Sequence, residues 1–159
     1  MENNIPVFKD NRGSFIPYNL KGTEWDQMNI STNTLCYTFR GMHYQTKPPQ
    51  TKLVKVIQGR VLDILYNLDT KKVETYELGL DDQLLIPSNC AHGFLTLKPN
   101  TIFTYLVSGN YNSESEHSIV WDTIPQIKSI IEYTIKDSKL TISNKDKIGK
   151  YLQTSLDTA

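Results

Sequence analysis

Hydrophobic and polar side chains alternate in short runs along most of the chain, which is the period of β-strands. The clearest run lies at residues 60–68, where apolar residues recur at every second position from Leu62 to Leu68. Short turn sequences such as Gln58-Gly59 separate the runs. The pattern predicts strands at residues 15–16, 53–57, 60–68, 73–80, 84–86, 94–97 and 102–107, with Pro17 interrupting the first.

Many short strands with turns between them indicate a β-sandwich or barrel, which we expect to form one domain over residues 1–159. Helical spacing becomes evident only near the end of the chain. There, Ser143-Asn144-Lys145-Asp146 resembles a capping box, and apolar residues follow at helical spacing, namely Ile148, Tyr151, Leu152 and Leu156. The sequence therefore predicts a mainly β fold with a short C-terminal helix.

The balance of charge argues against several classes of partner. The chain has 17 Lys and Arg residues and 17 Asp and Glu residues. It therefore lacks the excess of basic residues that is typical of proteins that bind nucleic acid. An anionic ligand would have to be held by a local cluster instead. No apolar run approaches the roughly eighteen residues of a membrane span, and the first residues lack a signal-peptide pattern. We therefore expect a cytoplasmic protein, in which Cys36 and Cys90 are too few for a disulfide framework.

The stretch Arg40-Gly41-Met42-His43-Tyr44-Gln45 combines a guanidinium and an imidazole three positions apart. In an extended strand, Arg40 and His43 point to opposite faces unless a bulge intervenes. Arginine suits an anionic group, and histidine suits proton transfer near neutral pH. The stretch is therefore a candidate catalytic strand, although a polar surface strand has the same composition.

Metal binding is the weaker interpretation of the three histidines, His43, His92 and His117. No second histidine follows His43 at the His-x-His spacing, and Lys52 downstream would repel a cation. Proton chemistry fits better because it needs a base, a carboxylate to hold the base, an acid and a cation. The candidates for these four roles are His43 or His92, Asp63 or Asp146, Tyr105 or Tyr111, and Lys52. Each of them, taken alone, is also an ordinary structural residue.

A set of segments in fixed order carries more information than any of these residues. The segments are Phe8-Lys9-Asp10-Asn11-Arg12-Gly13, Gln27-Met28-Asn29-Ile30-Ser31, Arg40 to Gln45, Lys52-Leu53-Val54-Lys55-Val56, Ala91-His92-Gly93-Phe94, Tyr105 with Tyr111, Ile119-Val120-Trp121-Asp122, and Ile142-Ser143-Asn144-Lys145-Asp146. In this order they resemble the dTDP-4-dehydrorhamnose 3,5-epimerase family, a branch of the cupins. The resemblance implies a jelly-roll protomer that acts as a homodimer and needs no metal or organic cofactor.

The resemblance also implies a reaction. The substrate would be a 4-keto-6-deoxy sugar linked to a nucleoside diphosphate, and the carbons beside the ketone would be inverted. His43 matches the family's general base, and Asp146 matches its carboxylate partner. Tyr105 matches the acid that returns the proton from the opposite face, and Lys52 matches the residue that stabilises the enolate oxygen.

Further positions match residues that hold the substrate. Those matched to nucleotide and diphosphate contacts are Arg12, Gln27, Asn29 and Arg40, while His92 and Tyr111 match residues near the sugar. The chain departs from the family at Pro17, where a glutamate is usual. Four alternatives stay open: a ketoisomerase of a similar nucleotide sugar, an epimerase of a GDP-linked keto sugar, a non-catalytic binding module and a metal-dependent cupin.

Overall fold

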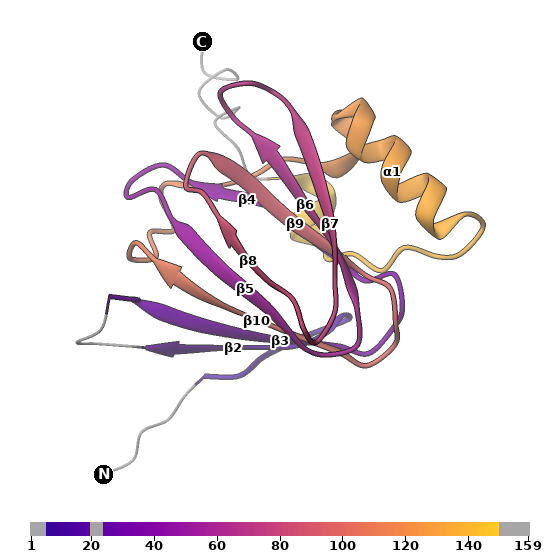
Figure 1. Ribbon diagram of the computed structural model, residues 1–159, viewed down its shortest axis with the longest axis horizontal. Helices are drawn as coiled ribbons and strands as arrows, with labels where there is room; N and C mark the ends of the chain where they lie inside the picture. The colour runs from indigo at the N-terminus through magenta and orange to yellow at the C-terminus, as the bar shows by residue number, and fades with distance from the viewer. Residues whose placement is uncertain (1–5, 20–23, 150–159) are drawn as a thin grey trace.

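Two antiparallel sheets face each other in the computed structural model, which describes residues 6–19 and 24–149 (Figure 1). The six-stranded sheet has the order β1-β2-β3-β10-β5-β8, and the five-stranded sheet has the order β11-β4-β9-β6-β7. The strands are β1 (Phe8–Asp10), β2 (Gly13–Asn19), β3 (Gln27–Asn33), β4 (Phe39–Gln45), β5 (Thr51–Gln58), β6 (Val61–Asn67), β7 (Val73–Leu78), β8 (Gln83–Ile86), β9 (Cys90–Thr96), β10 (Thr101–Ser108) and β11 (Glu116–Ser118). This is the predicted jelly-roll sandwich, and the mainly β prediction is confirmed.

The space between the sheets holds one apolar core. Alternate residues of β5, β6, β9 and β10 point into it, as the two-residue period of a strand requires. Its centre is formed by Val54, Val56, Phe94 and Phe103, which are almost fully buried. Phe94 and Phe103 come from opposite sheets, and their ring centroids are 4.2 Å apart. This core fills one part of the sandwich and leaves the other part for a cavity.

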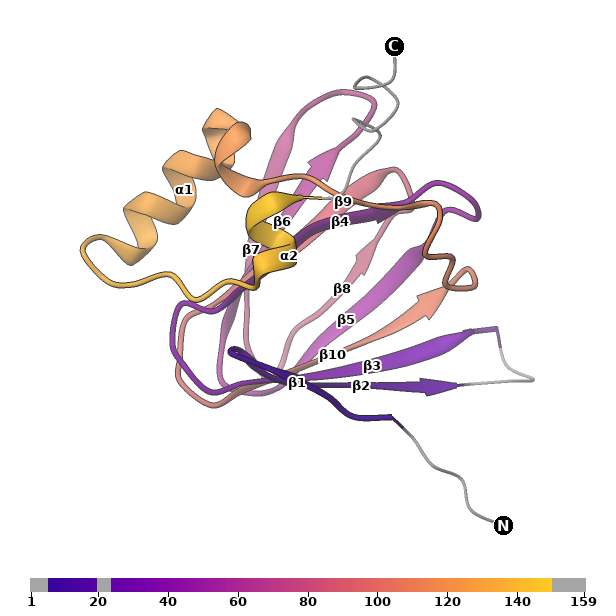
Figure 2. The same ribbon diagram turned by 180° about the vertical axis from the view of Figure 1, so that it is seen from behind.

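A second core lies on the outer face of the five-stranded sheet, under the helix α1 (Pro125–Ile135). Figure 2 shows this helix outside the sandwich, beyond β6 and β7. The helix was not predicted, although Ile127, Ile131 and Ile135 recur every fourth residue and are all buried. Its many β-branched residues lower helix propensity, so the helix depends on packing against the sheet.

We expect Ile131→Ala to lower the free energy of unfolding by about 2–5 kcal/mol, the usual cost of removing a large buried aliphatic side chain. Ile131 is fully buried between α1 and the sheet. Chemical denaturation would measure the change, with Tyr133→Ala as the control because Tyr133 lies on the same helix and is 81% exposed. Equal losses in the two variants would mean that α1 does not depend on its buried stripe.

The predicted C-terminal helix starts where the capping box placed it. The helix α2 (Asn144–Ile148) begins after Ser143, whose Oγ accepts a hydrogen bond of 3.2 Å from the backbone N–H of Asp146. A short 3₁₀ turn, η1 (Trp121–Thr123), precedes α1. The rest of the predicted helical pattern, including Tyr151, Leu152 and Leu156, lies outside the described residues. In Figure 2, α2 lies beside β4, which it contacts.

Two strands differ from the prediction for identifiable reasons. β2 runs through Pro17, because β1 pairs only with residues 13–15 and leaves the Pro17 side of the strand without a ladder on that edge. β3 was missed because its inward-facing residues are polar: Asn29, Ser31 and Asn33 are all buried. A strand that buries polar side chains does not show the hydrophobic alternation on which the prediction rested.

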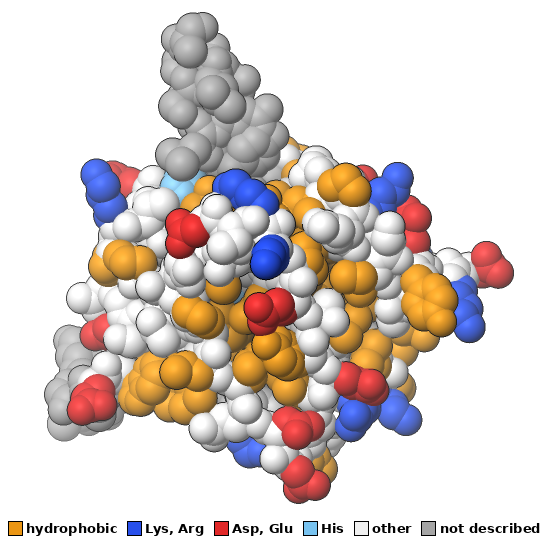
Figure 3. Space-filling view, turned by 45° about the horizontal axis from the view of Figure 1, so that its top comes forward, with side chains coloured by type: hydrophobic (Ala, Val, Ile, Leu, Met, Phe, Trp, Pro, Cys, Tyr) orange, Lys and Arg blue, Asp and Glu red, His pale blue; other side chains and the backbone are white. Residues whose placement is uncertain are grey.

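The surface reflects the neutral composition. On the face shown in Figure 3, acidic and basic side chains are interspersed among hydrophobic and uncharged ones. None of the helices in the described part of the chain is long and apolar enough to cross a membrane.

Candidate active site

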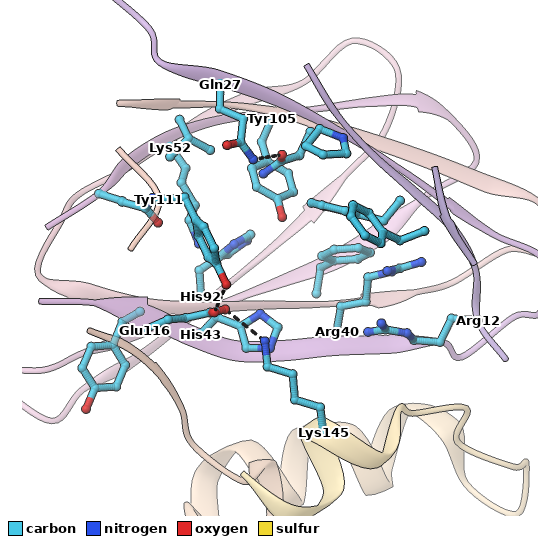
Figure 4. Close-up of a pocket in the computed structure, with 18 of the residues that line it drawn as sticks. Arg12, Gln27, Arg40, His43, Lys52, His92, Tyr105, Tyr111, Glu116 and Lys145 are labelled. Carbon is cyan, nitrogen blue, oxygen red and sulfur yellow. Dashed lines mark hydrogen bonds and ion pairs between the residues drawn. The ribbon is translucent and has the colours of Figure 1, made fainter. Parts of the chain in front are cut away.

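A cavity of about 490 Å³ lies between the two sheets. Both sheets contribute to its wall, as does the start of α2 (Figure 4). Nine of the ten predicted site residues line it: Arg12, Gln27, Asn29, Arg40, His43, Lys52, His92, Tyr105 and Tyr111. The tenth, Asp146, lies behind His43 and contacts it directly. The structure therefore brings all ten predicted site residues together.

A register shift in β4 places Arg40 and His43 on the same wall of the cavity. The pairing of β4 with β9 is irregular between these two residues, so the alternation of faces is broken there. Met42 between them turns outward and is buried in the core under α1. Gly41 has a φ of +135°, and a Cβ on it would lie 2.5 Å from the Cα of Gly93. Glycine is required at this position because the strands approach too closely for a side chain.

His43 is held by a carboxylate from the far end of the chain. Its Nε2 lies 2.6 Å from Oδ1 of Asp146, and the other oxygen of Asp146 accepts a 3.1 Å hydrogen bond from the Gly41 N–H. The carboxylate is 1% exposed, whereas the imidazole is 26% exposed toward the cavity. Burial raises the pKa of Asp146, but His43, the Gly41 N–H and Arg12 together lower it by more, so the net pKa lies below the ordinary value. Asp146 is therefore ionised beside the imidazole.

A second histidine–carboxylate pair lies next to the first. His43 is directly opposite His92 across β4 and β9, and Nε2 of His92 is 2.6 Å from Oδ1 of Asp63 on β6. Both groups are almost fully buried. Burial lowers the pKa of His92 and raises that of Asp63, so each group is shifted toward its neutral form. Residue types alone offered Asp63 or Asp146 as the carboxylate, and the resemblance paired Asp146 with His43. The structure contains that pair and gives His92 a carboxylate of its own, Asp63.

Lys52 and Tyr105 lie on the facing sheet. Nζ of Lys52 on β5 is 5.6 Å from the centroid of the Tyr105 ring on β10. Burial lowers the pKa of Lys52 to about 8 and raises that of Tyr105. Figure 4 shows the Tyr105 hydroxyl pointing into the cavity, toward the sheet that carries His43. The cavity thus has an imidazole on one wall and a phenol with an ammonium group on the other.

Two arginines give one part of the cavity a positive charge. Arg12 bonds Asp10 through its Nε at 3.0 and 3.1 Å, while its Nη1 lies 3.6 Å from Asp146. Arg40 is buried and donates from Nε to Asn33 at 2.8 Å. Burial lowers the pKa of Arg40 to about 10, and the nearby charge of Arg12 contributes. Two close guanidinium groups suit a ligand with more than one negative charge.

Two side-chain amides, those of Gln27 and Asn29, lie on β3. The side-chain amide of Gln27 donates to Oδ1 of Asn29 at 2.6 Å (Figure 4). Both side chains line the cavity from β3. Gln27 and Asn29 therefore present a hydrogen-bonding edge beside Tyr105, the partner of Asn29 across β3 and β10. Such an edge is suited to a polar heterocycle or sugar.

Glu116 and Lys145 were missed by the sequence analysis. Glu116 on β11 accepts a 2.9 Å hydrogen bond from the Tyr111 hydroxyl and a 3.1 Å ion pair from Lys145 on α2 (Figure 4). Burial raises the pKa of Glu116, but Lys145, His43 and the Tyr111 hydroxyl together lower it by more, so the carboxylate is ionised. Burial and this hydrogen bond raise the pKa of Tyr111 to about 12. The signal that could have identified Glu116 is its place on a strand directly after Tyr111, beside the strand of His43.

Sequence relatives share one name. The dTDP-4-dehydrorhamnose 3,5-epimerase of Pseudomonas aeruginosa is 32% identical over 161 residues, which cover 91% of this chain and 86% of the relative. The Methanothermobacter thermautotrophicus protein of the same name is 36% identical over 122 residues, 72% of this chain and 64% of the relative. The match with the Sinorhizobium fredii relative covers 53% of that protein. The chain thus spans less than two thirds of the length of the last two relatives.

Solved structures agree with these relatives. The crystal structure of dTDP-4-dehydrorhamnose 3,5-epimerase from Bacillus anthracis, with TDP and pyrophosphate bound, has a TM-score of 0.67 and 32% identity, and the match covers 93% of this chain and 91% of that one. The Legionella pneumophila enzyme in complex with dTDP-4-keto-L-rhamnose has a TM-score of 0.67 and 27% identity, over 94% and 85% of the two chains. The sequence model of dTDP-4-dehydrorhamnose 3,5-epimerase matches residues 1–154. The chain therefore belongs to the dTDP-4-dehydrorhamnose 3,5-epimerase family.

Proposed function

We propose that this protein is a cofactor-independent epimerase of a 4-keto-6-deoxy sugar linked to a nucleoside diphosphate, with a dTDP-4-dehydro-6-deoxyglucose type of substrate. One observation carries the proposal. His43, paired with Asp146, lies on one wall of the cavity, and Tyr105, next to Lys52, lies on the other. Inversion of a carbon centre through an enolate needs proton removal on one face and proton delivery on the opposite face.

The reaction starts at the carbon beside the ketone, whose hydrogen is acidified by the carbonyl group. His43 removes this proton, and the electron pair of the C–H bond moves onto the carbonyl oxygen to form an enolate. Asp146, 2.6 Å from the ring, holds the imidazole and stabilises the imidazolium that forms. The Lys52 ammonium stabilises the enolate oxygen, in the way that fixed positive groups stabilise developing charge.

The second half of the reaction inverts the centre. The hydroxyl of Tyr105 gives its proton to the opposite face of the same carbon, while the carbonyl re-forms. The neighbouring Lys52 offsets the negative charge of the tyrosinate that results. His43 then releases its proton to solvent and Tyr105 regains one, so nothing is oxidised or reduced over the cycle.

The nucleotide part of the substrate would bind at the arginine side of the cavity. Arg12 and Arg40 supply positive charge for the diphosphate, and Gln27 and Asn29 supply hydrogen bonds. Support comes from the Bacillus anthracis relative, which was crystallised with TDP and pyrophosphate. His92 and Tyr111 complete the wall near the sugar in this proposal.

Two measurements test this proposal: which nucleotide sugar the protein turns over, and which product it forms. The protein would be incubated with dTDP-linked and with GDP-linked 4-keto-6-deoxy sugars, and the products analysed by NMR. We expect inversion beside the ketone with the dTDP sugar. A product in which the carbonyl has moved to the neighbouring carbon would identify a ketoisomerase, and turnover of only the GDP-linked sugar would reject the dTDP assignment.

We further propose that the protein acts as a homodimer through the outer face of the six-stranded sheet. Four apolar residues lie in register across this face: Leu85, Leu53, Leu106 and Met28. Leu85 is 58% exposed and the other three are partly exposed. Both described α-helices pack against the other sheet. A continuous apolar row of this kind is typical of a surface that a second copy covers.

We expect Leu106→Glu to convert the dimer to a monomer, because it places a charge in the middle of the apolar row. Light scattering coupled to size-exclusion chromatography would give the mass of both proteins. The control is Tyr133→Glu, which adds the same charge on α1, at the other sheet. A dimer that persists with Leu106→Glu would place the interface elsewhere, and a monomeric wild type would reject the dimer.

A further inference from the structure

The guanidinium of Arg12 links two parts of the cavity that have separate tasks. Its Nη1 lies 3.6 Å from Oδ2 of Asp146, whose other oxygen is 2.6 Å from His43. On its other side, Arg12 bonds Asp10. The side chain of Arg12 is 15% exposed and lines the cavity, whereas Asp146 is 1% exposed. A ligand in the cavity can therefore reach Arg12 but not the carboxylate behind it.

We propose that Arg12 couples binding of the substrate diphosphate to the proton affinity of His43. This inference rests on the proposed function, which places the diphosphate at Arg12 and the base at His43. In the free protein, the positive charge of Arg12 partly cancels the field that Asp146 exerts on the imidazole. A bound diphosphate neutralises Arg12, and the carboxylate then acts on His43 with its full charge.

The direction of the effect follows from charge. An anion close to an imidazole favours the protonated form of the ring, and a cation disfavours it. The diphosphate adds negative charge next to Arg12, so it strengthens proton binding at His43. Because these groups are withdrawn from water, the interaction is screened less than one at the surface. Arg12 is accordingly a positioning residue for the base as well as a binding residue for the substrate.

Other charged and titratable groups face His43 and have to be separated from this effect. Lys145 of α2 is engaged by Glu116 of β11, and His92 of β9 is engaged by Asp63. The remaining groups on the same cavity wall or across from it are Asp10 of β1 (which bonds Arg12), Arg40 and Tyr44 of β4, Lys52 of β5, Tyr105 of β10 and Tyr111 of the loop before β11. Arg12 differs from these groups because it contacts the carboxylate that holds His43.

The coupling would serve catalysis because it ties the strength of the base to the presence of the substrate. A general base works best when its proton affinity matches the working pH. Binding of a nucleotide sugar strengthens the base when the carbon–hydrogen bond has to be broken, and the complexes that react are those whose His43 has not taken a proton from solvent.

Proton uptake during ligand binding tests the coupling. The probe is dTDP-glucose, which carries the diphosphate but has no ketone to enolise and no group that titrates near neutral pH. Calorimetric titration between pH 6 and 8, in buffers of different ionisation enthalpy, gives the number of protons taken up. We expect uptake of part of a proton, up to one, per molecule bound. Binding without uptake overturns the coupling but leaves the proposed function standing, whereas failure to bind overturns both.

Two variants identify the groups involved. His43→Asn should bind dTDP-glucose without proton uptake, and uptake that persists would assign it to Lys52 or His92 and reject the inference. Arg12→Gln should show less uptake than the wild type, because its His43 already binds a proton more tightly. The control is Arg60→Gln, which removes an arginine that pairs with Glu77 and does not line the cavity; its uptake should match that of the wild type.

A measurement on the free protein keeps the test decisive if Arg12→Gln binds too weakly. NMR of isotope-labelled histidine follows the protonation of His43 with pH. We expect its midpoint in Arg12→Gln to lie above that of the wild type, because the substitution removes a cation that contacts Asp146. A midpoint that is unchanged or lower would overturn the inference.

Discussion

The variant His43→Asn is expected to lose solvent exchange at the carbons beside the ketone. A positioned general base contributes about 10²–10⁴-fold to the rate, and we expect a loss in this range. Asparagine keeps a polar group close to Asp146 but cannot accept a proton at neutral pH. The rate of deuterium incorporation into the 4-keto sugar, followed by NMR in deuterated water, measures the effect.

The interpretation of this loss requires a folded variant. Thermal unfolding and dTDP-glucose binding should both stay close to the wild type, because His43 is a partly exposed group of the cavity wall. If His43→Asn exchanges deuterium at the wild-type rate, His43 is not the base. The neighbouring His92, paired with Asp63, would then be the candidate.

The variant Tyr105→Phe is expected to separate proton removal from inversion. His43 can still take the proton, so deuterium should enter the substrate from the His43 side with the original configuration retained. Delivery from the opposite face should fall by about 10²–10⁴-fold because the acid is missing. The NMR spectrum distinguishes a deuterated starting sugar from an inverted product in a single experiment.

A matched control for this variant is Tyr133→Phe, which removes the same hydroxyl from an exposed position on α1. It should leave both exchange and inversion unchanged. Inversion by Tyr105→Phe at the wild-type rate would remove Tyr105 from the acid role. Tyr111 is a poor replacement because its hydroxyl proton is already donated to Glu116 in a 2.9 Å hydrogen bond.

The strands in which apolar residues recur at alternate positions could be predicted from the sequence. β5, β6 and β10 alternate apolar residues, and each lies within two residues of its predicted limits. The strand β3 was not predicted because its inner face carries the polar residues Asn29, Ser31 and Asn33. Asn29 lines the cavity and Asn33 accepts a hydrogen bond from Arg40, so the alternation was lost where the strand serves the cavity. The helix α1 was not predicted for a different reason. Its isoleucines favour a strand by intrinsic propensity, and they form a helix here because that helix packs against a sheet.

The site residues could be named from the resemblance, but their arrangement could not. Strand alternation placed Arg40 and His43 on opposite faces, and only the register shift in β4 brings them to one wall. The pairing of His43 with Asp146 joins residues 103 positions apart, which local spacing does not encode. Asp63 and Asp146 are equivalent candidates by residue type. The resemblance paired Asp146 with His43, and the fold adds the pairing of Asp63 with His92. Glu116 was missed because the residues before it, Asn112 to Ser115, are polar and show no strand alternation, although Glu116 itself lies on β11.

The most direct test of the central claim is solvent deuterium incorporation by the wild-type protein with dTDP-4-dehydro-6-deoxyglucose as substrate. The account predicts that deuterium enters at a carbon beside the ketone, together with inversion at that carbon and without any added metal or cofactor. If folded protein that binds dTDP-glucose leaves every carbon-bound hydrogen of the keto sugar unexchanged, the cavity is a binding site and the epimerase proposal is wrong.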